Sequence, residues 1–172
     1  MNEINLINRF CDGDKSALKE IHDRYATLLR IRAYMILKDQ DEATIVVEKM
    51  FAVFWYNRRK MRKIVDLKEF LLDAVEQTSW SIADRPYVVR SLLACVGEKD
   101  KNRVNWGDIT RLINQLEDKL YPAEQAKMAV LYVVQEKDYF EISCEMNKRL
   151  GNVRGEMRLV LIMLKLAVGG NI

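Results

Sequence analysis

Residues 41–63 read DEATIVVEKMFAVFWYNRRKMRK, and this stretch decides how the rest of the chain is interpreted. Apolar side chains occupy most positions between 43 and 56 and leave almost no polar face, whereas an ordinary surface helix has one apolar stripe. A cluster of arginines and lysines follows at 58–63, where the carbonyl end of a helix favours positive charge. We therefore expect a helix that is buried between neighbours or presents a second apolar face to a partner.

Helical periodicity continues on both sides of this stretch, and no convincing strand alternation appears. Either Asp39 or Asp41 is expected to cap the central helix, with Glu42 in its first turn. The pattern and its turn residues predict further helices over residues 3–11, over residues 15–37 after a break at 12–14, and from a capping box at Asp66 to a point before Pro86. Short connections between these helices indicate a compact antiparallel bundle.

The second half of the chain begins with a change of character. The stretch GEKDKNRVNWG at 97–107 is the most loop-like in the chain, and we interpret it as part of an interdomain linker over 86–107. Beyond the linker, the pattern predicts helices over 108–120, 122–136 and 139–146, and one from Val153 onward with Asn152 as its N-cap. The predicted fold is therefore all-α, with two small helical domains at 1–85 and 108–172.

Composition narrows the class of protein. The chain has 172 residues, of which 49% are hydrophobic and 31% charged, and its net charge of +3 is too small to imply nucleic-acid binding by itself. Scattered cysteines, no signal-peptide pattern and no apolar run long enough to span a bilayer lead us to expect a cytoplasmic protein. His22 alone cannot build a zinc site, and no phosphate-binding or nucleophile motif appears, so we expect no cofactor, no small-molecule substrate and no enzyme.

Three segments of the first half, at 6–29, 41–61 and 67–85, resemble domain two of bacterial extracytoplasmic-function sigma factors. They read LINRFCDGDKSALKEIHDRYATLL, DEATIVVEKMFAVFWYNRRKM and LKEFLLDAVEQTSWSIADR. In the second half, LYPAEQAKMAVLYVV and YFEISCEMNKRLGNVRGEMRLVLIMLK resemble domain four, the helix-turn-helix domain, with Tyr139, Glu141, Ile142 and Val153 as the main matches. The resemblance implies a sigma factor that binds core RNA polymerase and promoter DNA to start transcription, under the control of an anti-sigma factor.

The resemblance also assigns roles to residues of the first half. The central helix would dock on a coiled-coil helix pair of the polymerase clamp through Glu42, Ile45, Val46, Glu48, Lys49, Phe51, Ala52 and Trp55. The segment after it would hold the separated non-template strand, a task that needs cations for the backbone and an aromatic group or pocket for an unstacked base. The residues implied for that task are Arg58, Arg59, Lys60, Arg62, Lys63, Lys68, Gln77 and Trp80.

In the second half, the resemblance implies a DNA-reading pair of helices. The first helix of a helix-turn-helix crosses the DNA backbone, and the second enters the major groove at its N-terminal end. Residues 139–146 would form the first of these helices. The DNA-contacting residues implied in the turn and on the second helix are Lys148, Arg149, Asn152, Arg154 and Arg158.

The chain departs from the family pattern at several positions. Thr44 and Val47 stand where the family usually has an acidic residue and an amide, and Gly155 occupies a position that normally bears a DNA-facing side chain. A second function therefore stays open, that of a divergent sigma-like protein that keeps the fold but acts through protein contacts. Without the resemblance, the basic cluster at 58–63 also fits a solvated helix end.

Overall fold

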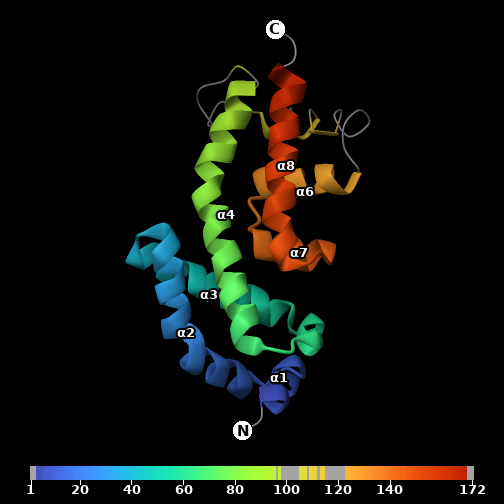
Figure 1. Ribbon diagram of the computed structural model, residues 1–172. Helices are drawn as coiled ribbons and strands as arrows, with labels where there is room; N and C mark the ends of the chain where they lie inside the picture. Colours follow the sequence, from blue (N-terminus) through green and yellow to red (C-terminus); the bar gives the residue numbers. More distant parts are fainter. Residues whose placement is uncertain are drawn as a thin grey trace. The chain divides into compact units, whose positions relative to one another are not determined.

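A computed structural model describes residues 3–95, 97, 105–107, 109–111, 113–114 and 123–169 (Figure 1). The regular structure in these ranges is helical, with no strand among them, which confirms the all-α class expected from the sequence. Within the same ranges, no helix is both long enough and apolar enough to cross a membrane.

Contacts divide the chain into two compact units, Met1–Trp80 (unit 1) and Ser81–Ile172 (unit 2). The helix α4 (Leu67–Cys95) supplies residues to both units, because the boundary falls inside it. The sequence predicts a linker at 86–107; its first residues, 86–95, are helical in α4, and most of the others lie outside the described ranges.

Unit 1 contains α1 (Glu3–Cys11), α2 (Lys15–Leu37), α3 (Gln40–Tyr56), the 3₁₀ helix η1 (Arg58–Lys63) and the first part of α4. The bounds of α1 and α2 confirm the helices predicted over 3–11 and 15–37. Asp39, rather than Asp41, caps α3, because its side chain accepts a hydrogen bond from the Glu42 amide at 2.9 Å. Lys38, just before it, ends α2 in the left-handed region with φ of 61°.

The buried face of α3 forms the centre of unit 1. The Phe54 ring stacks on Phe10 of α1 at a centroid distance of 4.2 Å and lies 5.8 Å from the ring of Phe70 on α4. Phe51 packs against the ring of His22 on α2 at 4.9 Å. The core residues of α3, each 4% exposed or less, are Ala43, Val46, Val47, Met50, Phe51 and Phe54. Through its core aromatic residues α3 contacts α1, α2 and α4.

The prediction that the fourth helix ends before Pro86 is wrong, because α4 continues through Pro86 to Cys95. Proline inside a helix removes one backbone hydrogen bond and costs roughly 3 kcal/mol relative to alanine. Burial beyond the proline offsets this cost, since Val88, Leu92 and Leu93 are 1%, 3% and 8% exposed. Tertiary packing therefore decides where α4 ends.

Unit 2 contains the rest of α4, α6 (Ala123–Val133), α7 (Tyr139–Met146) and α8 (Leu150–Gly169). The bounds of α7 confirm the helix predicted over 139–146, and a capping box between Asp138 and Glu141 begins it. Of the predicted helix at 108–120, only a few residues are described, among them the buried Ile109 and Ile113.

The prediction that the last helix begins at Val153 is also wrong, because α8 begins at Leu150 and Asn152 lies in its first turn. The connection from α7 is short for a physical reason. Asn147 ends α7 in the left-handed region with φ of 52°, and the Lys148 amide donates to the Ser143 carbonyl at 3.0 Å. The Ser143 hydroxyl then donates to the Lys148 carbonyl at 2.8 Å, which closes the turn.

Pro86→Ala should raise the free energy of unfolding, by up to about 3 kcal/mol, because alanine restores an amide donor inside α4. Chemical denaturation of the full chain measures the change. Ala83→Pro, at an exposed position one turn earlier on the same helix, is the matched control and should destabilise the protein. A Pro86→Ala variant less stable than the wild type would mean that α4 does not run unbroken through residue 86.

Candidate functional site

The outward face of α3 is the first of the surfaces that the sequence singles out. Val46 and Phe51, two of the predicted polymerase contacts, are buried in the core of unit 1 and lie beneath the exposed surface of α3. Lys49 and Trp55 are half-buried. Gln40, Asp41 and Thr44 are exposed near the start of the helix. Five further exposed residues recur every three or four positions along α3, and we name them the α3 stripe: Glu42, Ile45, Glu48, Ala52 and Tyr56.

Two members of the α3 stripe are large apolar residues that are highly exposed to solvent. Ile45 is 65% exposed and Tyr56 is 84% exposed. The predicted docking surface ends at Tyr56, although Tyr56 is not one of the contact residues that the resemblance implies; its place four residues after Ala52 puts it on the same line. Behind the stripe, Glu48 Oε1 lies 3.1 Å from His22 Nε2 on α2, so one acidic member is tied to the neighbouring helix.

The basic cluster that follows α3 folds into η1, and its cations differ in how they are placed. The buried Met61 anchors the segment to the core, at 5% exposure. Arg58 turns back over the Trp55 ring, with its guanidinium carbon 4.5 Å from the ring centroid, and donates to the Trp55 carbonyl at 3.1 Å. Arg59, Lys60 and Lys63 are exposed to solvent, as is Lys68 at the start of α4.

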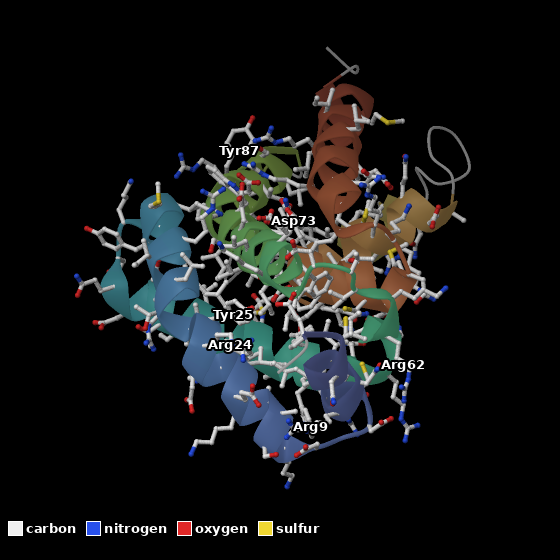
Figure 2. All side chains as sticks on the ribbon, turned by 60° about the horizontal axis from the view of Figure 1, so that its bottom comes forward. Arg9, Arg24, Tyr25, Arg62, Asp73 and Tyr87 are labelled. Carbon is white, nitrogen blue, oxygen red and sulfur yellow. The ribbon has the colours of Figure 1, made fainter. Side chains whose placement is uncertain are left out.

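Arg62, like Arg58, is held by a neighbouring group of unit 1. Its side chain (labelled in Figure 2) reaches the turn between α1 and α2, where Asp12 accepts its hydrogen bond. That hydrogen bond raises the pKa of the Arg62 guanidinium, which stays charged. Arg62 therefore helps to hold η1 in place, and the exposed Arg59 and Lys63 lie on either side of it in the sequence.

Gln77 and Trp80 lie one turn apart on α4 and are both half-buried. The side-chain oxygen of Gln77 is buried, and no donor in the described part of the chain reaches it. A buried acceptor without a donor costs roughly 1–3 kcal/mol, so such an atom favours a water molecule or a ligand that supplies an N–H group. Among the residues implied for DNA contact, Gln77 Oε1 shares this property with Arg58 Nε, which is also buried without a hydrogen-bond partner in the described ranges.

In unit 2, two of the cations implied for DNA contact are held by carboxylates. Lys148 Nζ lies 2.8 Å from Glu156 and 3.3 Å from Glu124, and the hydrogen bond to Glu156 raises its pKa. Arg154 Nε lies 3.0 Å from Asp84 of α4, and its side chain is only 19% exposed. The others, Arg149, Asn152 and Arg158, are exposed, and a Cβ at Gly155 would meet open space.

Asp84 belongs to a partly buried polar cluster that the sequence did not reveal. It accepts hydrogen bonds from Arg154 and, at 3.2 Å, from the hydroxyl of Tyr139, and burial raises the pKa of that hydroxyl. The neighbouring Arg85 donates to the Tyr132 carbonyl at 2.6 Å and lies over the Tyr132 ring. The two tyrosine rings stack at 5.0 Å, and burial raises the pKa of Tyr132 to about 12. This cluster joins α4, α6, α7 and α8.

No protein-family model matches the chain, and no curated protein matches its sequence. Within the described ranges, no group of histidine, cysteine and acidic side chains could hold a metal ion. The residues just described are therefore the basis on which a function is inferred.

Asp84→Asn should lower the free energy of unfolding by about 2 kcal/mol, because the largely buried Arg154 would then face a neutral partner. Denaturation of the full chain with urea measures this change. Glu136→Gln, which also removes one exposed negative charge, is the matched control and should stay close to the wild type. Equal stability of both variants would show that Arg154 does not depend on Asp84 and is available to other partners.

Proposed function

We propose that this chain is a sigma factor of the extracytoplasmic-function type, which binds core RNA polymerase through the α3 stripe and contacts promoter DNA through the cations that follow it. One observation carries the proposal. An exposed line of apolar and acidic side chains on α3 leads directly into the exposed cations of η1. Protein-binding and DNA-binding chemistry are thus adjacent in one continuous stretch of chain.

The α3 stripe has the chemistry of a protein-docking surface. Covering large apolar residues such as Ile45 and Tyr56 with a partner makes the free energy of binding more favourable. Aromatic residues are also enriched at the centres of interfaces. Glu42 and Glu48 favour a partner that carries basic residues beside an apolar seam. The aromatic core behind α3 keeps the surface preorganised, which lowers the cost of binding.

The cations after α3 support contact with a separated DNA strand. Arg59, Lys60 and Lys63 offer charges to the phosphate backbone, and their attraction does not depend on sequence. An unstacked base needs hydrogen-bond partners for its edge, and the half-buried Gln77 carries a side-chain amide of the kind that supplies them. Trp80, one turn further along α4, offers a ring for stacking.

A second candidate function is that of a sigma-like protein that binds its partners without reading a promoter. It is favoured by the ion pairs of Lys148 and Arg154, which engage two cations that a DNA-reading helix would present. Leu159 and Ile162 on α8 are 55% and 54% exposed, which suits a protein contact better than a DNA contact. On this second function, polymerase binding persists and DNA binding does not.

Ile45→Glu should weaken binding to bacterial core RNA polymerase at least tenfold, because a charge would replace one of the two large apolar residues of the α3 stripe. Titration of labelled protein with core polymerase measures the affinity. Ile31→Glu places the same change on an exposed isoleucine of α2 and should bind like the wild type. The proposal fails if Ile45→Glu binds as tightly as the control, or if the wild type does not bind core polymerase at all.

The DNA half of the proposal is tested by salt dependence. Changing Arg59 and Lys63 together to alanine should flatten the plot of log affinity for single-stranded DNA against log salt, by roughly 0.7 for each phosphate that is no longer neutralised. Lys15 and Lys19, two exposed lysines of α2, form the matched double-alanine control and should leave the slope unchanged. Equal slopes for the two double variants would make η1 a solvated helix end and favour the second candidate function.

A further inference from the structure

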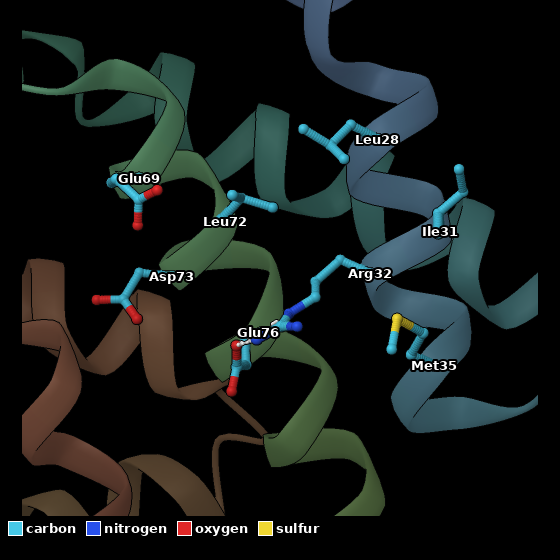
Figure 3. A pocket seen from close by; sticks show the side chains of 8 residues that line it. All are labelled: Leu28, Ile31, Arg32, Met35, Glu69, Leu72, Asp73 and Glu76. Atoms are coloured by element: carbon cyan, nitrogen blue, oxygen red, sulfur yellow. Dashed lines mark hydrogen bonds and ion pairs between the residues drawn. The ribbon is translucent and has the colours of Figure 1, made fainter.

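A groove lies between α2 and α4 within unit 1 (Figure 3). It encloses about 480 Å³. It shares no residue with the α3 stripe or with η1, so the proposed function leaves it without a role. Its lining residues are Leu28, Ile31, Arg32, Met35, Glu69, Leu72, Asp73 and Glu76.

One wall of the groove is apolar. Leu28, Ile31 and Met35 of α2 are 38%, 56% and 57% exposed, which is unusual for three large apolar residues on neighbouring turns. Their spacing of three and four residues puts them in a line of roughly 10 Å, at about 1.5 Å of rise per residue. Leu72 points toward Leu28 from the other side and extends the apolar surface across the groove (Figure 3).

The other wall is acidic. Glu69, Asp73 and Glu76 follow one another along α4 at spacings of four and three residues. Arg32 reaches across from α2 and its Nε donates to Glu76 at 3.1 Å, so Glu76 is already balanced (Figure 3). Glu69 and Asp73, the other two carboxylates of this wall, are exposed to solvent.

We propose that this groove binds an amphipathic helix of a partner protein, with the helix's apolar face on the α2 wall and its lysines or arginines toward Glu69 and Asp73. The spacing of Leu28, Ile31 and Met35 matches the spacing of anchors in a helix that lies in a groove. The charge of the other wall selects a basic partner and repels nucleic acid, whose phosphates would face carboxylates. The groove is thus a second protein-binding surface of unit 1.

The test uses the full chain and a synthetic helical peptide of about 14 residues, or four turns. The peptide carries leucines at helical anchor spacing and lysines along one flank, and a matched peptide has glutamate at each lysine position. Fluorescence anisotropy should give at least tenfold tighter binding for the lysine peptide. Ile31→Glu should weaken that binding at least tenfold, whereas Ile45→Glu on the α3 stripe should leave it unchanged.

A charge exchange separates recognition from a merely structural effect. The double variant Glu69→Lys, Asp73→Lys should lose affinity for the lysine peptide and gain affinity for the glutamate peptide. Equal binding of the two peptides by the wild type, or no binding of either, overturns the proposal. So does self-association that Ile31→Glu abolishes, because a second copy of the chain would then occupy the groove. The polymerase titration is read separately, so failure here does not affect the proposed function.

Discussion

The stacking of Phe54 on Phe10 is the interaction on which unit 1 depends. The same ring lies close to Phe70, so one side chain of α3 positions both the first helix and the start of α4. Phe51, one turn earlier, does the same for α2 through the ring of His22. Because these contacts use the inner face of α3 completely, its outer face is left for the stripe of Glu42, Ile45, Glu48, Ala52 and Tyr56.

Unit 2 is organised around a different kind of contact. Asp84 and Arg85, adjacent on α4, hold the other helices through charged and backbone hydrogen bonds, and each contacts one of the stacked tyrosines, Asp84 the Tyr139 hydroxyl and Arg85 the Tyr132 ring. A largely buried polar network of this kind is costly when a member is missing and favours one arrangement when every member is present. The ion pair with Asp84 also holds Arg154 against α4, so its side chain is not presented to solvent as a DNA-contacting arginine would be.

Local signals predicted much of the helical framework. A break at Gly13 and the spacing of apolar residues located α1 and α2 in full, whereas the cap of α3 stayed ambiguous until Asp39 was seen to accept the Glu42 amide. The end of α4 was wrongly predicted because burial of Val88 and Leu92 outweighs the local effect of Pro86. Periodicity could not separate Phe51 from Ile45 either, because nearly every position of α3 is apolar. The partner of Arg154 lies 70 residues away, beyond the reach of any local pattern.

The engagement of Arg58 and Arg62 within unit 1 has a kinetic consequence. A net charge of +3, with two of the most prominent cations already facing protein groups, creates only a weak long-range field. On the proposed function, association with DNA would proceed without strong electrostatic steering, at roughly the 10⁵–10⁶ M⁻¹s⁻¹ that is typical of weakly charged partners. On the proposed function, such a chain is poorly suited to searching DNA alone. It would reach its promoter already bound to the polymerase, because the weak positive field of the chain does not support a search of DNA on its own.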